Sequence, residues 1–121
     1  MGMAAVIHKK GAPDNFVGEE IKVGSPERGQ VRLRSTAVGV NFADTYHRAG
    51  TPHPMNVGDS PVVLGFEGVG KIEELGPGVT GFSVGERVCT CLPPAGDNAD
   101  QMRVTLRCCS YCRERAWGAG E

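Results

Sequence analysis

Residues 30–50 have the sequence QVRLRSTAVGVNFADTYHRAG, in which a strand pattern runs directly into a helix pattern. In the first part, apolar Val31 and Leu33 alternate with charged Arg32 and Arg34. Alternation with a period of two is typical of a strand that buries one face. The sequence therefore predicts a strand over residues 30–40.

The second part of this stretch, residues 41–49, contains no glycine or proline and predicts a short helix. Phe42, Thr45 and Tyr46 follow one another at spacings of three and four, so we expect them on the apolar side of that helix. Gly50 is a natural end for it, because glycine readily adopts the left-handed conformation that closes a helix.

Outside this stretch, the composition favours many short strands joined by tight turns. The 121 residues include 18 glycines and 8 prolines, and 40% are hydrophobic. A glycine- and proline-rich chain with enough apolar residues for a core is typical of a barrel or sandwich. Further strands are expected at residues 3–8, 16–23, 65–75, 87–91 and 100–106.

The charge balance excludes some classes of partner. Thirteen Lys and Arg against fourteen Asp and Glu leave a formal net charge of −1. We therefore expect no nucleic acid and no membrane as partners, because both favour a basic excess. The first residues, MGMAAVIH, have neither the charged nor the apolar region of a signal peptide, so a cytoplasmic protein is expected.

Four segments together resemble one family. The chain is similar to the N-terminal, GroES-like domain of the medium-chain dehydrogenase/reductase superfamily, and within it to the zinc-independent quinone oxidoreductases related to zeta-crystallin. The segments that carry this resemblance are QVRLR at 30–34, VGVNFADTYHRAG at 38–50, LGFEGVG at 64–70 and GPGVTGFSVGERV at 76–88.

The resemblance implies a reductase that needs no metal. Alcohol dehydrogenases of this superfamily carry zinc-binding Cys and His residues where this chain has Asn41 and Phe66. An amide and a phenyl ring are not zinc ligands, so no zinc is expected. By resemblance, the reaction is hydride transfer from NADPH to a quinone or enone, in which the protein orients the reactants.

The resemblance also assigns roles to residues of this chain. Asn41 is expected to bind the cofactor near the nicotinamide ribose and to act in catalysis with Tyr46. The substrate pocket is expected to contain Tyr46 and Phe66, although core packing is an equally good interpretation of Tyr46. The residues expected to give structural support are Asp44, Arg48 and Glu67, the last by binding backbone amides at the glycine-rich turn.

The implied fold is mainly β, an irregular GroES-like partial barrel with a short helix over residues 1–94, and the family's Rossmann domain is absent. The isolated chain is therefore expected neither to bind NADPH well nor to turn over substrate. Residues 95–121 diverge from the family after about Leu106, where Arg, Cys, Ala and Gly accumulate. A frame-shifted tail and a partly disordered tail are both open interpretations.

Two other functions stay open at this point. One is a non-enzymatic β-barrel interaction module, whose open sheet edge would accept a partner or a second copy in a homodimer. The other is a small zinc protein whose ligands are Cys89, Cys91, Cys109 and Cys112. Against the zinc protein stands the expectation of free cysteines in a reducing compartment, since the chain has five cysteines.

Overall fold

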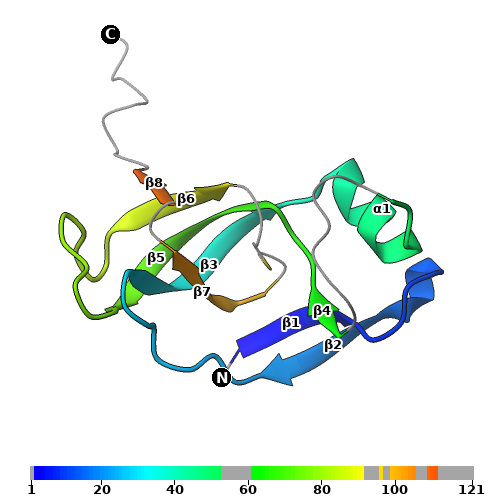
Figure 1. The fold of residues 1–121 in the computed structure, drawn as a ribbon, viewed down its shortest axis with the longest axis horizontal. Coiled ribbons are helices and arrows are strands. Elements are labelled where there is room, and N and C mark those ends of the chain that lie inside the picture. The colour runs from blue at the N-terminus through cyan, green and yellow to red at the C-terminus, as the bar shows by residue number, and fades with distance from the viewer. Residues whose placement is uncertain (1, 53–60, 92–95, 97–98, 106–108, 112–121) are drawn as a thin grey trace, which may run out of the picture.

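In the part of the chain that the structure describes, there are two antiparallel sheets, one α-helix and a short 3-10 helix (Figure 1). The structure is a computed structural model that describes residues 2–52, 61–91, 96 and 99–105, together with the backbone of residues 109–111. In this part of the chain, no helix is long and apolar enough to cross a membrane.

The smaller sheet has three strands in the order β2-β1-β4. Its strands are β1 (Gly2–Ile7), β2 (Phe16–Ile21) and β4 (Val62–Val63), and a 3-10 helix at Pro13–Asn15 leads into β2. Both pairs are antiparallel. The turn-forming residues between β1 and β2 explain why these neighbouring strands pair as a hairpin.

The larger sheet has five strands in the order β7-β3-β5-β6-β8, and every neighbouring pair is antiparallel. Its strands are β3 (Gln30–Gly39), β5 (Glu67–Leu75), β6 (Arg87–Cys91), β7 (Gln101–Thr105) and β8 (Cys109–Tyr111). The central strand pair β3–β5 contains two register shifts, which let the sheet bend.

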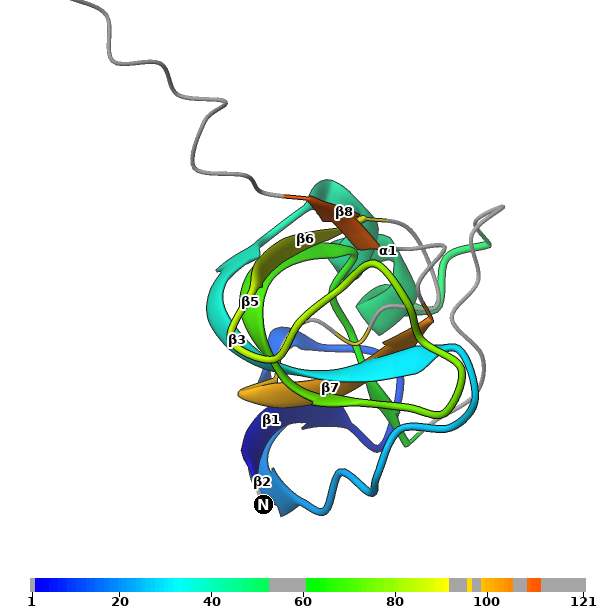
Figure 2. The same cartoon turned by 90° about the vertical axis from the view of Figure 1, so that its left-hand side faces the viewer.

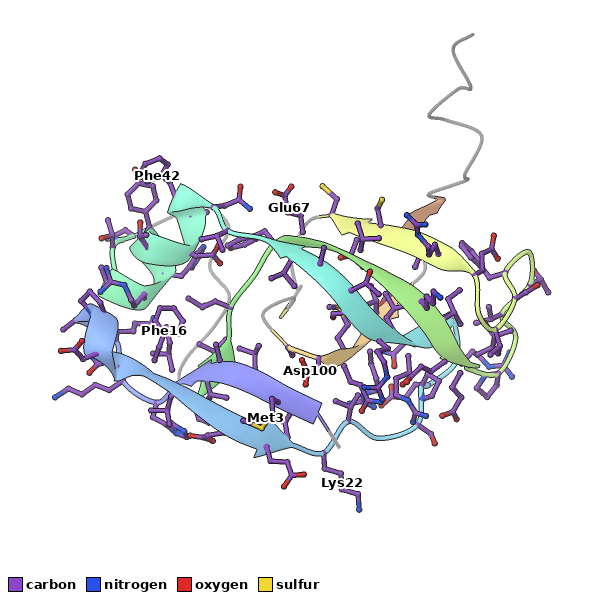
Figure 3. The ribbon with its side chains drawn as sticks, turned by 180° about the vertical axis from the view of Figure 1, so that it is seen from behind. Met3, Phe16, Lys22, Phe42, Glu67 and Asp100 are labelled. Atoms are coloured by element: carbon purple, nitrogen blue, oxygen red, sulfur yellow. The ribbon has the colours of Figure 1, made fainter. Side chains whose placement is uncertain are left out.

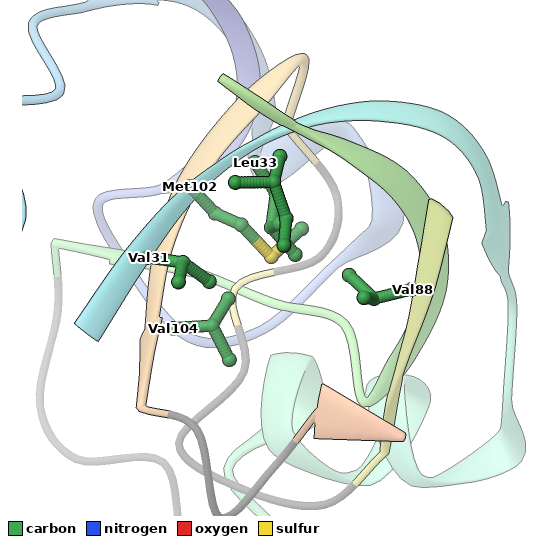
Figure 4. Close-up of a cluster of buried hydrophobic side chains, with 6 residues drawn as sticks. Val31, Leu33, Val88, Met102 and Val104 are labelled. Atoms are coloured by element: carbon green, nitrogen blue, oxygen red, sulfur yellow. The ribbon is translucent and has the colours of Figure 1, made fainter. Parts of the chain in front are cut away.

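The main core lies on the concave side of the larger sheet (Figure 4). The alternation predicted for residues 30–40 is confirmed, because Val31 and Leu33 are buried while Arg34 is exposed. The buried members of this core are Val31, Leu33, Ile72, Val88, Met102 and Val104. A second, smaller core of Ala4, Val6 and Ala99 lies at the three-stranded sheet.

Asp100 joins the two sheets. Its backbone N–H donates to the Met3 carbonyl and its own carbonyl accepts from the Ser35 N–H, both at 2.8 Å. Figure 2 shows the two sheets curling around the interior. No sheet closes into a barrel, so the expected fold class, mainly β with an irregular partial barrel and a short helix, is confirmed.

The predicted apolar face of the helix is wrong. Helix α1 spans Phe42–Ala49, as expected, but Phe42 is 82% exposed and Tyr46 is 44% exposed. The buried residues of α1 are Asp44 and His47. Asp44 accepts a hydrogen bond from the Asn41 N–H, and the ring of His47 packs against that of Phe66.

Part of the segment after residue 94 belongs to the larger sheet. Strand β7 pairs with β3, as the predicted strand at 100–106 requires, and β8 pairs with β6. Strand β8 lies in the segment after Leu106, where the sequence diverges from the family. The boundary after residue 94 stays a prediction, and the tail residues 106–108 and 112–121 lie outside the described residues.

Candidate active site

The candidate site begins where β3 passes into α1. Asn41 is the residue before the first turn of the helix, in extended conformation, and its backbone N–H donates to Asp44 Oδ2 at 2.8 Å. An acidic side chain three residues into a helix that accepts from this N–H is part of a capping box. Asp44 therefore fixes the backbone of Asn41 relative to α1.

Glu67, at the start of β5, reaches the side chain of Asn41. Asn41 Nδ2 donates to Glu67 Oε1 at 3.2 Å, between side chains that are open to solvent. Figure 3 shows Glu67 between α1 and β6, on the outer side of the sheet. The sequence prediction had Glu67 bind backbone amides, whereas the bond described for it is to a side chain.

Arg48 connects the far end of α1 to the loop after β1. Its guanidinium donates to the Gly11 carbonyl, and the Gly11 N–H donates to the Arg48 carbonyl at 2.7 Å. Two bonds in opposite directions hold this loop against the last turn of the helix. The helix ends at Gly50, whose φ of 80° is the left-handed conformation.

Phe66 is buried, and its ring lies against that of His47 on α1. It is 6% exposed, and its ring lies 5.1 Å from the ring of His47, centroid to centroid. Tyr46, in contrast, is 44% exposed. The two aromatic residues predicted to share a substrate pocket therefore lie in different surroundings.

His47 is a buried residue that was not predicted to take part in the site. It lies in the segment that carries the family resemblance and is 5% exposed. Its position three residues after Asp44 was a usable signal, because residues three apart share a helix face. The structure thus places Asn41, Asp44 and Glu67 together, and His47 with Phe66.

A groove of about 700 Å³ lies between α1, the strands β1 and β2, and the second half of β3. Apolar side chains line most of it, and Figure 3 shows Phe16 between the helix and β2. Of the predicted site residues, only Asp44 and Arg48 line this groove. Asp44 Oδ1 is buried with no hydrogen-bond partner among the described residues.

The four-thiolate zinc site was an alternative left open by the sequence, and two of its members, the side chain of Cys109 and the whole of Cys112, lie outside the described residues. Cys89 is disulfide-bonded, so it has no thiolate to offer a metal, and the expectation of a free thiol there is wrong. Cys91 is free and exposed. Within the described residues, no three His, Cys, Asp or Glu side chains are grouped to hold a metal ion.

Comparison with known proteins identifies the family. Residues 27–120 match the alcohol dehydrogenase GroES-like domain. The chain belongs to this family. A 2-haloacrylate reductase from a Burkholderia species is 74% identical over 96 residues, which are 79% of this chain and 29% of that protein.

Solved structures agree with this assignment. The crystal structure of a 2-haloacrylate reductase superimposes with a TM-score of 0.83 at 57% identity, covering 93% of this chain and 32% of that one. An Escherichia coli quinone oxidoreductase complexed with NADPH gives 0.81 at 26% identity, covering 90% and 32%. The chain therefore spans about a third of the length of these relatives.

The family implies two groups, a zinc ion and NADPH. Asn41 and Phe66 offer no zinc ligand. For NADPH, the glycine-rich residues 65–70 run into strand β5 and no helix follows them, so they form no helix N-terminus for the cofactor's phosphates. The described residues therefore do not fit a dinucleotide by themselves, and Asn41 offers a single polar contact.

Proposed function

We propose that this chain is the substrate-domain part of an NADPH-dependent reductase. The substrate class is a small molecule with an electron-poor double bond next to a carbonyl or carboxyl group, such as a 2-haloacrylate, a quinone or an enone. The observation that carries the proposal is the 74% identity to a 2-haloacrylate reductase. The quinone alternative is supported by the likeness to a quinone oxidoreductase complexed with NADPH.

In this proposal NADPH supplies the hydride, and the residues of this chain bind and orient. Asn41 offers an amide N–H beside the start of α1, and Tyr46, which is 44% exposed, lies on the same helix. Phe66 supports the site from the interior through His47. Asp44, Arg48 and Glu67 hold the helix start, the helix end and the Asn41 side chain.

Zinc independence belongs to the same proposal and is supported by the donor chemistry at positions 41 and 66. A cytoplasmic location stays a prediction. The disulfide at Cys89 argues against it, because disulfides are unusual in a reducing compartment.

The test is a chimera. The segment of this chain that aligns with the Burkholderia reductase replaces the reductase's own segment, and consumption of NADPH is followed with a 2-haloacrylate and with benzoquinone. We expect NADPH oxidation with at least one of them, and none from the isolated 121-residue chain. A folded chimera that oxidises NADPH with neither substrate would contradict the proposal.

A second candidate, an interaction module that forms a homodimer, is favoured by one observation. On the side of β3 opposite β5, strand β7 pairs only with residues 30–34, so in the described part of the chain residues 36–39 have no strand on that side. Val38 on this edge is 42% exposed. An open edge of this kind can pair with the same edge of a second copy.

Sedimentation of the isolated chain tests this candidate. A homodimer through the β3 edge predicts a dimer that Val38→Lys converts to a monomer, whereas the matched change Val17→Lys on β2 leaves it dimeric. A monomer at all concentrations would remove the candidate and leave the reductase proposal unaffected.

A further inference from the structure

Glu67 and Gly39 face each other across the central strands β5 and β3, where they are register partners. The side chain of Glu67 lies directly over Gly39. A Cβ added at Gly39 would lie 2.6 Å from Glu67 Cγ and 2.8 Å from its Cδ, closer than such atoms approach in proteins. The Glu67 carboxyl can therefore occupy this position only because Gly39 has no side chain.

From this place Glu67 Oε1 accepts a hydrogen bond from Asn41 Nδ2 at 3.2 Å. A carboxylate only accepts, so the amide nitrogen of Asn41 must face it and the amide oxygen must face away. The Asn41 backbone is already fixed by its bond to Asp44. Both halves of Asn41 are thus held, the backbone by α1 and the carboxamide by β5.

This geometry also determines what Asn41 offers to a ligand. Nδ2 carries two hydrogens, and Glu67 takes one of them. The other remains for an acceptor, such as a carbonyl or hydroxyl oxygen of a bound molecule. A group held in one orientation before binding loses less conformational freedom when the ligand arrives.

We propose that Glu67 is a positioning residue that fixes the orientation of the Asn41 carboxamide, and that Gly39 is the glycine that makes room for it. The inference rests on the proposed function for the role of Asn41 in binding. The positioning itself rests only on the contacts among Gly39, Asn41 and Glu67.

The positioning is tested on the 121-residue chain by NMR of the Asn41 side-chain amide. Glu67→Met keeps the length of the side chain and removes the acceptor, whereas Glu67→Gln keeps a weaker one. Gly39→Ala leaves Glu67 unchanged but forces its carboxyl to move. We expect Glu67→Met and Gly39→Ala to shift the Asn41 amide signals and speed their hydrogen exchange, with Glu67→Gln intermediate.

Two matched controls guard against a general loss of structure. Glu20→Met alters an exposed glutamate on β2, and Gly18→Ala alters a strand glycine where a Cβ would make only an ordinary 3.9 Å contact. Both should leave the Asn41 signals unchanged. Unchanged Asn41 signals in Glu67→Met and Gly39→Ala would overturn the proposal.

The functional consequence is tested in the chimera. Glu67→Met should raise KM or lower kcat so that kcat/KM falls by roughly two- to tenfold, the range expected for one exposed hydrogen bond. Adding Glu67→Met to Asn41→Ala should cause no further loss, because the two residues act as one unit. An additive loss would contradict the proposed positioning.

The two proposals can fail separately. A chimera without activity overturns the proposed function and leaves the NMR result to decide the positioning. Asn41 signals that respond to Glu67 in an active chimera whose kcat/KM does not change would instead show that Asn41 takes no part in binding.

Discussion

At the scale of single residues, Asn41 is where the helix start and the candidate site coincide. Its backbone N–H is bound to Asp44 and its side chain to Glu67. Asn41→Ala removes the carboxamide while the backbone bond to Asp44 can persist. We expect kcat/KM of the chimera for its better substrate to fall about tenfold, the cost of one lost hydrogen bond.

The control for this prediction is stability. Asn41→Ala should also remove some helix-capping energy, on the order of 1 kcal/mol. The activity is therefore measured at a temperature where the variant is fully folded by circular dichroism. Unchanged kcat/KM would mean that Asn41 does not touch the reacting molecules.

The backbones of Glu27 and Gln30 pass so close to Gly76 that a side chain there would clash with them. A Cβ there would lie 2.7 Å from the Gln30 carbonyl oxygen and would overlap that of Glu27, and neither backbone oxygen can swing away as a side chain does. We expect Gly76→Ala to lower the free energy of unfolding by roughly 1–3 kcal/mol. Chemical denaturation measures this.

The matched control is Gly24→Ala, because a Cβ at Gly24 meets nothing within 4 Å and its φ is not positive. It should change the free energy of unfolding by no more than about 0.5 kcal/mol. Equal stability of the two variants would show that the chain relaxes around residue 76 at little cost.

At the scale of elements, a charged cluster ties the outer face of β5 to β3 and β7. Glu73 accepts from Arg34 Nε, and from Gln101 Nε2 at 2.6 Å, with Arg32 also nearby. Burial acts to raise the pKa of Glu73. The hydrogen bonds from Arg34 and Gln101 and the positive charges of Arg34 and Arg32 outweigh burial, so the pKa lies below its usual 4.5.

The lowered pKa predicts a loss of stability in acid. A carboxyl whose pKa is lower in the folded state stabilises the fold above its unfolded pKa, and this contribution disappears as the pH falls through the folded value. We expect Glu73→Gln to flatten the decline in the free energy of unfolding below about pH 4.5. Glu20→Gln, on an exposed glutamate without a described bond, should leave the decline unchanged.

Most of the strands were predictable because their signal is local, whereas β4 and β8 were not predicted. The strands predicted at 3–8, 16–23, 30–40, 65–75, 87–91 and 100–106 lie within two residues of the observed bounds. The buried face of α1 was not predictable from the spacing of its aromatic residues. His47 is buried because it meets Phe66, and Asn41 meets Glu67, partners 19 and 26 residues away along the chain.

At the scale of the whole molecule, the site depends on strand order. The β3–β5 pairing brings residue 67 beside residue 39. This register cannot be predicted from the periodicity of either strand. The resemblance to a family assigned roles to residues, whereas the structure was needed to show that Glu67 bonds to Asn41 and that Phe66 is buried. The groove was also missed, because it lies between elements from three separate parts of the chain.

The two sheets have separate small cores and meet at Asp100. The carboxylate of Asp100 also accepts from the Met3 N–H at 3.2 Å. Asp100→Ala removes this side-chain bond and leaves the two backbone bonds of residue 100. We therefore expect β1 to open locally more often, while β3 and β5, which are anchored in the main core, keep their protection.

Hydrogen exchange followed by NMR measures this difference. Amides of residues 2–7 should exchange faster in Asp100→Ala than in the wild type, and those of β3 and β5 should not. Asp100→Asn, which keeps an acceptor oxygen, should restore most of the protection of β1. If exchange accelerated equally in both sheets, the sheets would open as one cooperative unit, and Asp100 would not be the local link between them that its hydrogen bonds indicate.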